Sequence, residues 1–189
     1  MKLIALITLI AWPVIPLFWI PIHLFPRFFR KLKLFTYVLP VIAWLPVAYL
    51  IYQNRDFLLH YEADFSGIIR GTGIFLLIAG TGIHLWTAKL LNFWGLIGLP
   101  EVYEKMQGRF VATGAFSVVR HPTYLAHTIM FTGIFLASGV ISVGIVTGVD
   151  FLVINLIVIP LEEKELLGRF GEEYRDYIKK VPKLIPRLK

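Results

Sequence analysis

Three groups of polar and aromatic residues in the C-terminal half of the chain have the side chains to bind a charged ligand. The first is RHPTY at 120–124, the second is the acidic pair at 162–163, and the third is FGEEYRDYIKKVP at 170–182. Basic and acidic groups that leave water are costly unless they pair or hold a ligand. The absence of cysteine excludes a disulfide scaffold, a thiolate zinc site and a cysteine nucleophile.

The composition places these groups in a membrane protein. Of the 189 residues, 57% are hydrophobic and 16% are charged, whereas a typical soluble domain has about 45–50% and about 25%. A soluble core of this size cannot bury so many apolar side chains. The net charge of +7 therefore favours loops facing anionic lipid or the cytoplasm. Nucleic-acid binding is not expected, because the basic residues are not interleaved with exposed aromatic ones.

Uncharged runs predict five membrane-spanning helices in an all-α, multi-pass protein. The first three spans cover 3–22, 34–52 and 71–88, and the third can begin near Ser66. The apolar stretch 123–161 would form a helix of roughly 58 Å, nearly twice the bilayer core of about 30 Å, so it must fold back. The turn is predicted at Ser138, Gly139, Ser142 and Gly144, giving a C-terminal hairpin of spans at about 124–140 and 142–161.

Small residues and prolines predict local features of these spans. Prolines bend the first span, which a membrane helix tolerates if neighbouring helices satisfy the freed carbonyls. The third span has a face on which another helix can approach closely. Its small residues are Gly67, Gly71, Gly73, Gly80 and Gly82.

Basic residues in the connecting segments predict the orientation. Segment 23–33 has four basic residues and no acidic one, and 89–122 and the tail after Leu161 also have a basic excess. The positive-inside rule places these three segments in the cytoplasm and the N-terminus outside. Any site for a water-soluble cofactor is then expected on the cytoplasmic face.

The tail predicts a cytoplasmic amphipathic helix that ends at Pro182. Its apolar positions fall on one face, and they are Leu166, Leu167, Phe170, Tyr174, Tyr177, Ile178 and Val181. Periodicity leaves two alternatives open. The helix either lies on lipid headgroups or folds over segment 89–122 and closes a pocket.

The hairpin brings its own two ends together, so Arg120 and His121 are expected beside Glu162 and Glu163. In this order, the motifs resemble the C-terminal pattern of the isoprenylcysteine carboxyl methyltransferase family. That family belongs to a wider group of membrane methyltransferases that includes the phospholipid methyltransferases. The segment FVATGAF at 110–116 looks like the family's segment ending in Gly-x-Tyr, with Phe116 in place of Tyr. The resemblance covers about residues 105–187.

The resemblance implies methyl transfer from S-adenosylmethionine to the carboxylate of a C-terminal prenylated cysteine. It implies an N-terminal three-span region at 1–92 and a catalytic region at 93–189, with the cofactor in a cytoplasmic pocket. A carboxylate is already a nucleophile, so the enzyme needs to align the reactants and exclude water, and no general base is required.

The resemblance also implies roles for individual residues. Glu162 or Glu163 would receive the cofactor's amino group or ribose hydroxyls, and Arg120 or His121 would hold its carboxylate. The candidate catalytic residues are Arg120, Asn155 and Glu162. The candidate cofactor-binding residues are Arg109, Phe110, Val111, Phe116, Arg120, His121, Pro122, Thr123, Tyr124, Glu162 and Glu163. No metal site is expected.

One departure concerns the acceptor. The family's eukaryotic enzymes have an Arg about one turn before the Glu pair, where this chain has Val158. Asn155, one turn deeper, is a polar candidate for orienting the acceptor, and its alternative role is a hydrogen bond between helices. Structural roles are expected for His84, His127 and Asp150, with Asp150 close enough to the turn to reach the outer interface.

Other functions remain open at this stage. They are a phospholipid N-methyltransferase of the same fold, an NADPH-dependent sterol-type membrane reductase with an Arg-His-Pro-like motif, and a non-enzymatic lipid-binding protein. A Rossmann nucleotide site is excluded, because the Gly-x-Gly at 71–73 lies inside an apolar helix.

Overall fold

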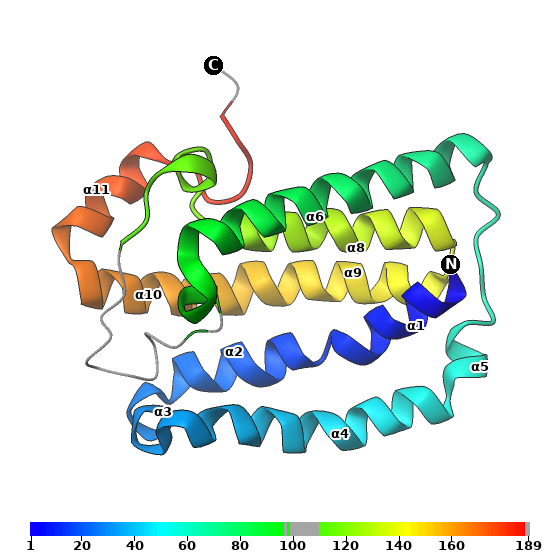
Figure 1. Cartoon of the computed structure of the whole chain (residues 1–189), viewed down its shortest axis with the longest axis horizontal. Coiled ribbons are helices and arrows are strands. Elements are labelled where there is room, and N and C mark those ends of the chain that lie inside the picture. The colour runs from blue at the N-terminus through cyan, green and yellow to red at the C-terminus, as the bar shows by residue number, and fades with distance from the viewer. Residues whose placement is uncertain (97, 99–109, 188–189) are drawn as a thin grey trace.

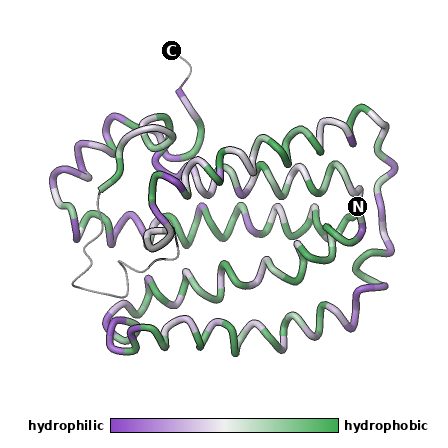
Figure 2. Tube along the Cα trace, viewed as in Figure 1, coloured by the Kyte–Doolittle hydropathy of each residue, from purple (hydrophilic) through white to green (hydrophobic). Residues whose placement is uncertain are grey.

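The computed structural model describes residues 1–96, 98 and 110–187, which form long helices joined by short connections (Figure 1). These described residues contain no β-strand, and an isolated bridge pairs Glu62 with Val140. Apolar residues predominate along the long helices, whereas hydrophilic residues gather at the ends of the bundle and in the tail (Figure 2). Four helical segments are long and apolar enough to cross a bilayer, namely 2–24, 26–53, 67–92 and 141–170. The predicted all-α membrane architecture is confirmed.

The first predicted span is broken at Trp12-Pro13 into α1 (Lys2–Ala11) and α2 (Val14–Leu24). A proline has no N–H and its ring collides with the preceding turn, so the helix axis changes direction there. The Trp44 indole donates a hydrogen bond to the Ile10 carbonyl at 2.7 Å. As predicted, a neighbouring helix therefore satisfies a backbone group at the break.

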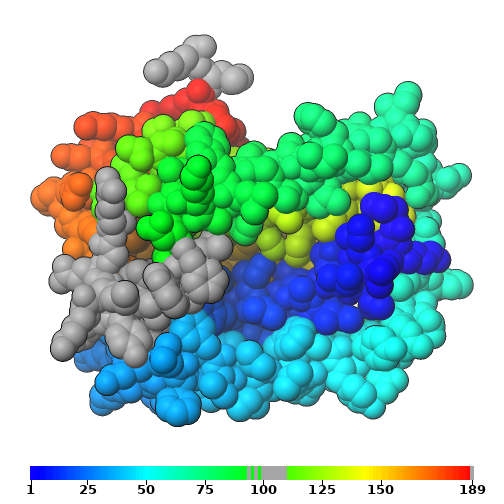
Figure 3. Space-filling view, viewed as in Figure 1, coloured from blue at the N-terminus to red at the C-terminus, as the bar shows by residue number. Residues whose placement is uncertain are grey.

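The chain then returns along the second predicted span. The returning elements are α3 (Pro26–Leu32), the 3-10 turn η1 (Lys33–Tyr37), α4 (Val38–Gln53) and the short α5 (Arg55–Leu58). On the face seen in Figure 3, α1 and α2 lie between α4 and the pair formed by α6 (Gly67–Leu96) and α8 (Pro122–Ser138). Helix α6 is interrupted at Asn92, whose backbone is left-handed at φ +61°.

Glycines let α6 and α8 pack with their backbones in contact. A Cβ added to Gly133 would lie 2.5 Å from a backbone nitrogen of α6, and one on Gly80 would lie 2.9 Å from a carbonyl oxygen of α8. Gly73 meets the backbone of α8 equally closely. The predicted small-residue face is therefore confirmed at Gly73 and Gly80. Open space surrounds the three others, Gly67, Gly71 and Gly82.

The long apolar stretch folds back at Gly139, inside the predicted turn. Gly139 has φ +76°, and a Cβ there would lie 2.6 Å from the Ala63 carbonyl oxygen, so both conformation and contact require glycine. The second arm of the helical hairpin is one continuous helix, made of α9 (Ile141–Val153), the π-helical turn η3 (Ile154–Val158) and α10 (Ile159–Phe170). Helix α8 has 17 residues, at the lower limit of about 17–25 for a spanning helix.

The predicted single amphipathic helix of the tail is two helices. Helix α10 continues past Leu161 without interruption, and α11 (Glu172–Lys180) starts after Gly171, which has φ +55°. The apolar face of α11 packs against Phe110 and Ala112, next to the 3-10 turn η2 (Gly114–Ser117). Of the two alternatives, the structure therefore supports the helix that folds over the segment before α8.

The three segments richest in basic residues share one end of the bundle. Helix α3, the residues leading into α8, and the pair α10 and α11 lie at that end (Figure 1). The N-terminus, α5 and the Gly139 turn lie at the opposite end. The positive-inside rule grouped the same three segments on one membrane face.

Candidate functional site

The two ends of the C-terminal hairpin meet, as predicted. Arg120 Nε donates to Glu163 Oε1 at 2.9 Å, although 43 residues separate them in sequence. His121 Nε2 lies 3.0 Å from the same oxygen, and His121 Nδ1 lies 3.7 Å from Glu162 Oε2. The side chains of Arg120 and His121 are only 10% and 3% exposed. This end of the bundle therefore contains buried charges that are held close together.

Arg120 ties the hairpin to the tail. Its Nη1 donates to the carbonyl oxygens of Val181 at 2.6 Å and Ile178 at 3.3 Å. Its backbone N–H donates to the Pro182 carbonyl at 2.8 Å. Carbonyl groups at a helix C-terminus carry partial negative charge, so the guanidinium bridges the end of α11 and the Glu163 carboxylate. Its role in this arrangement is to position α10 and α11 at the entry to α8.

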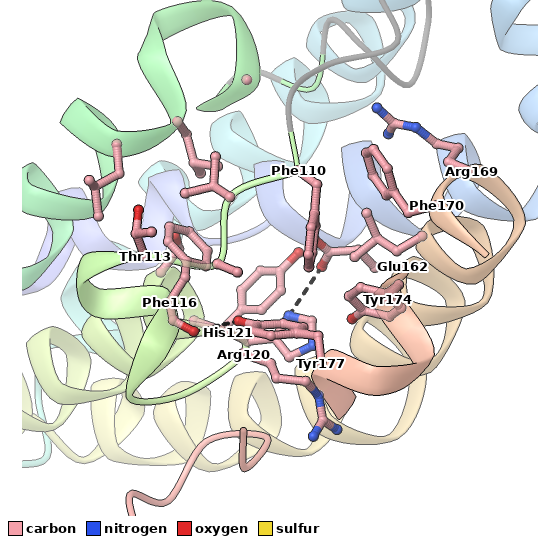
Figure 4. Close-up of a pocket in the computed structure, with 18 of the residues that line it drawn as sticks. Phe110, Thr113, Phe116, Arg120, His121, Glu162, Arg169, Phe170, Tyr174 and Tyr177 are labelled. Atoms are coloured by element: carbon pink, nitrogen blue, oxygen red, sulfur yellow. Dashed lines mark hydrogen bonds and ion pairs between the residues drawn. The ribbon is translucent and has the colours of Figure 1, made fainter. Parts of the chain in front are cut away.

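Glu162, one residue before Glu163, points in another direction. Figure 4 shows its carboxylate directed toward His121 and into a cavity next to Phe110. Its Oε2 atom is buried and has no hydrogen-bond partner among the described residues. Burying an acceptor without a donor is costly, so such an atom marks a place where a ligand can donate a hydrogen bond.

The cavity has a volume of about 740 Å³, within the range of about 300–1,000 Å³ for small-molecule sites. From the N-terminal half it is lined by Ile15, Trp19, His84, Leu90, Leu91, Asn92 and Gly95. From the C-terminal half it is lined by Phe110, Val111, Ala112, Thr113, Phe116, Arg120, His121, Thr123, Tyr124, His127, Glu162, Leu166, Arg169, Phe170, Tyr174 and Tyr177. Helices from both halves of the chain thus form the walls.

Aromatic rings form the wall nearest to α11. The Phe110 ring centroid lies 5.3 Å from that of Phe170, 5.9 Å from Tyr174 and 5.2 Å from Tyr177. Tyr174 and Tyr177 are three residues apart on α11, so they share its buried face. On the other side of the cavity, the Tyr124 ring stacks on His121 at 5.8 Å. Aromatic rings therefore line the same cavity as the Glu162 carboxylate.

The two phenols of α11 are neutral hydrogen-bonding groups. Tyr177 donates to the Phe116 carbonyl at 2.5 Å, and burial raises the pKa of Tyr177 to about 12. Burial, with the negative charges of Glu163 and Glu162, raises the pKa of Tyr174 even further. The Tyr174 hydroxyl is buried and has no hydrogen-bond partner in the described part of the chain. Like Glu162, it offers an unused polar group to a ligand.

The structure brings most of the predicted site residues to this cavity. Those that line it are Phe110, Val111, Phe116, Arg120, His121, Thr123, Tyr124 and Glu162. Glu163 and Pro122 lie behind the wall, where Glu163 binds Arg120 and His121 and Pro122 starts α8. Arg109 lies outside the described residues.

Asn155 does not line the cavity. Its side-chain amide donates to the Phe151 carbonyl of its own helix at 2.9 Å, and Lys183 Nζ donates to the Asn155 carbonyl at 3.1 Å. These contacts of Asn155 include neither a place in the cavity wall nor a side-chain hydrogen bond to another spanning helix. Val158, where the resembling enzymes have an Arg, is fully buried and apolar.

Sequence reasoning missed the wall from the N-terminal half. Ile15 and Trp19 belong to apolar runs in which every position looks alike, so no motif distinguishes them. The signal that was available was His84, an ionisable residue inside a predicted span, which is a functional suspect by default. Its Nδ1 atom is buried without a hydrogen-bond partner among the described residues.

The expectation that Asp150 reaches the outer interface is wrong. Asp150 is 1% exposed because α9 turns it toward α1 and α8. The Trp12 indole donates to Asp150 Oδ1 at 2.8 Å. His127 Nε2 lies 3.2 Å from Asp150 Oδ2, at ion-pair distance but without hydrogen-bond alignment. His127 lines the cavity, so a buried carboxylate stands behind one of its walls.

The fold and site define a helical membrane protein with a small-molecule cavity at one end of the bundle. The chain belongs to the phospholipid methyltransferase family, whose profile matches residues 69–175, more than half of the chain. The wider group of membrane methyltransferases predicted from the motifs is thereby confirmed. Among solved structures, none matches the chain.

Curated relatives carry the name methanethiol S-methyltransferase. The protein from Pseudomonas deceptionensis is 30% identical over 161 residues, which cover 82% of this chain and 59% of the relative. The protein from Crocosphaera subtropica is 32% identical over 119 residues, covering 59% of this chain and 45% of the relative. Methanethiol S-methyltransferase 1 of Bradyrhizobium diazoefficiens is 32% identical over 115 residues, covering 57% and 39%. The chain thus matches between 39% and 59% of the length of these relatives.

Proposed function

We propose that the protein is a membrane methyltransferase that binds S-adenosylmethionine in the cavity and methylates a small thiol. The observation that carries the proposal is the buried Oε2 atom of Glu162, which has no hydrogen-bond partner among the described residues and faces an aromatic-lined cavity of about 740 Å³. The family of the chain and the names of its relatives support the same reaction class.

The residues around the cavity fit the chemical groups of the donor. Its ammonium and ribose hydroxyls are hydrogen-bond donors, and Glu162 supplies an acceptor oxygen that lies 3.7 Å from His121 Nδ1, too far for a hydrogen bond. The rings of Phe110, Phe116 and Tyr124 supply faces for an adenine and for a cationic sulfur. The donor would supply an activated methyl group on that sulfur.

The acceptor proposed is a thiol because, among the described residues, both arginines that line the cavity already have acidic partners, Arg120 with Glu163 and Arg169 with Glu165. Arg120 is bound to Glu163 and to carbonyls of the tail, and Val158 stands where the resembling enzymes have an Arg. A neutral thiol, unlike a carboxylate, requires no cation to orient it. The relatives named methanethiol S-methyltransferase make methanethiol the first acceptor to test.

The carboxylate of a prenylated cysteine is the second candidate acceptor. The observation that favours it is the apolar wall from α2, in which Ile15 and Trp19 line the cavity. A prenyl chain would be accommodated against such side chains by burial of apolar surface.

The residues of the chain are proposed to act by binding, positioning and exclusion of water. Glu162 holds the donor, and the Arg120–Glu163 pair keeps α10 and α11 in place around it. Phe110, Tyr174 and Tyr177 close the side toward α11, which keeps water away from the reacting atoms. Holding donor and acceptor side by side supplies much of the rate enhancement.

The proposal also includes the orientation of the protein in the membrane and the contribution of each region of the chain to the cavity. The end of the bundle with α3, α10 and α11 faces the cytoplasm, because it contains the most basic connecting segments. The region 93–189 supplies the donor site, and the region 1–92 adds the wall formed by Ile15, Trp19 and His84.

The test uses the full chain purified in detergent. Calorimetry with S-adenosylmethionine, its demethylated product and NADPH comes first, and binding of the first two is expected. Labelled donor is then offered with methanethiol, a farnesylated cysteine or phosphatidylethanolamine, and dimethyl sulfide is the expected product. A base-labile methyl ester would identify the prenylcysteine carboxylate as the acceptor instead of the thiol. A methylated headgroup would identify a phospholipid as the acceptor. Binding of NADPH without S-adenosylmethionine, or of neither, would overturn the proposal.

A further inference from the structure

A buried carboxylate and a histidine form a pair inside the membrane domain that the donor site does not use. Asp150 on α9 is 1% exposed and accepts a hydrogen bond from the Trp12 indole at 2.8 Å. Its other oxygen lies 3.2 Å from His127 Nε2 on α8. Buried ionisable groups inside spanning helices are expensive, and they mark functional positions by default.

His127 lines the cavity and is close to a buried carboxylate. Its Nε2 atom lies at ion-pair distance from Asp150 without hydrogen-bond alignment, and no hydrogen bond to Nδ1 is found within the described residues. His127 lies four residues after Thr123, so both share one face of α8, and both line the cavity. The Thr123 hydroxyl is also buried without a hydrogen-bond partner among the described residues. Two polar side chains on one face of α8 thus line the cavity.

The chemistry of a thiol acceptor requires a group of this kind. The nucleophile is the thiolate, and an ordinary thiol such as that of cysteine, with a pKa of about 8.5, is mostly protonated at neutral pH. A histidine oriented by a carboxylate is a common general base, because the carboxylate fixes the ring and stabilises its protonated form. Glu162 is already assigned to the donor.

We propose that His127 is the general base for the acceptor and that Asp150 is its positioning residue, an inference that rests on the proposed thiol methylation. The thiol S–H bond breaks, and its proton moves to His127 Nδ1. The sulfur electron pair forms the new bond to the methyl carbon while the methyl–sulfonium bond breaks, leaving S-adenosylhomocysteine and a methyl thioether. The proton then returns from His127 to water.

Groups on three neighbouring elements face this pair. Asp150 approaches His127 from α9, the Trp12 indole binds Asp150 from the end of α1, and His84 interacts electrostatically with His127 from α6. The Phe131 ring lies 4.0 Å from the His127 ring, centroid to centroid, and limits its rotation. These contacts restrict the orientation of the imidazole at the cavity wall.

The test compares acceptors of different acidity in wild type, H127Q and D150N. An alkyl thiol needs a base, whereas an acidic aryl thiol is already a thiolate at the assay pH. With the alkyl thiol, H127Q is expected to lose roughly 100-fold to 10,000-fold in kcat, and D150N is expected to lose less. With the aryl thiol, both losses are expected to shrink to a few-fold. A loss of equal size with both thiols would assign the pair a structural role and overturn the proposal.

Two further measurements do not depend on turnover. Calorimetry is expected to give unchanged S-adenosylmethionine affinity in H127Q, D150N and the control H60Q, whose histidine is exposed near the opposite end of the bundle. Nitrogen-15 histidine spectra are expected to show His127 with Nε2 protonated and Nδ1 free, and D150N is expected to redistribute that proton. A wild-type signal with Nδ1 protonated would contradict the proposal. If wild type binds the donor but methylates neither thiol, the proposed acceptor class fails instead.

Discussion

Arg120 and Glu163 form an ion pair that joins the two ends of the C-terminal hairpin, with Arg120 Nη2 and Glu163 Oε1 2.9 Å apart. The same guanidinium also holds the carbonyls of Ile178 and Val181 at the end of α11. One side chain thus connects three elements that form the cavity. Glu162, the neighbour of Glu163, is left to face the cavity.

Removal of the arginine is therefore expected to destabilise the protein. R120A removes the donor of two helix-terminal carbonyls and a charged partner of the Glu163 carboxylate, which keeps its contact with His121. Breaking such a buried pair costs roughly 3 kcal/mol. The control is R175A, which removes an exposed arginine paired with Glu172 and is expected to change the free energy of unfolding by less than about 0.5 kcal/mol. Unfolding in mixed detergent measures both. Equal effects of the two substitutions would contradict the connecting role of Arg120.

The contribution of Tyr177 to the free energy of unfolding is expected to be lost at alkaline pH. Burial raises its pKa to about 12, above the ordinary value of about 10, because the fold favours the neutral phenol that donates to the Phe116 carbonyl. The folded state then binds more protons than the unfolded state between these two values. The stabilisation from Tyr177 is complete below about pH 10 and is lost as the pH rises toward about 12.

Spectroscopic titration and denaturation measure this prediction. Y177F is expected to remove the phenolate absorbance that appears near pH 12, and the stability advantage of wild type over Y177F is expected to shrink above about pH 10. Y61F, at an exposed position, serves as the control and is expected to leave that high-pH component in place. A Tyr177 phenol that titrates at the ordinary value would contradict its buried, hydrogen-bonded position.

The hairpin and the meeting of its ends could be predicted because they follow from length and geometry. An apolar stretch much longer than the bilayer is thick must turn back, and the turn must occur where the backbone tolerates it, as at Gly139. Once the turn is fixed, Arg120 and Glu163 must lie on the same side. The order of the polar motifs then predicted the family.

The direction of each carboxylate could not be predicted from the sequence. Glu162 and Glu163 are adjacent, so they point about 100° apart on a helix, and the rotation of α10 decides which faces the cavity. The π-helical turn η3 inserts an extra residue into a helical turn and changes that rotation. The sequence shows no sign of it, which is why both glutamates were expected to bind the cofactor.

The inward position of Asp150 depended on tertiary contacts that composition does not encode. Its short distance from the turn predicted a position at the membrane interface. Inside the bundle, however, Asp150 accepts a hydrogen bond from the Trp12 indole and lies at ion-pair distance from the His127 ring. Partners 138 residues apart in sequence, such as Trp12 and Asp150, cannot be paired by periodicity. For the same reason, the sequence did not reveal that α2 contributes a wall of the cavity.

The close packing of α6 on α8 provides a prediction with an internal control. G73A is expected to destabilise the protein by roughly 1–3 kcal/mol, because its methyl group would collide with the backbone of α8. G71A, two residues away on the same helix, faces open space and is expected to be neutral or slightly stabilising. Unfolding in mixed detergent compares the two variants. A destabilising G71A or a neutral G73A would place the α6–α8 contact on a different face.

Glu162 is expected to affect donor binding without affecting stability, the reverse of Arg120. Its buried Oε2 atom has no hydrogen-bond partner among the described residues, so E162A removes a desolvated carboxylate without breaking a good bond in the free protein. Loss of a charge-assisted hydrogen bond to the donor corresponds to roughly 10-fold to 100-fold weaker binding. Calorimetry with S-adenosylhomocysteine measures the affinity, and unfolding in mixed detergent measures the stability. E173A, at an exposed position on α11, is expected to change neither. Wild-type affinity in E162A would assign the donor site to other residues of the cavity.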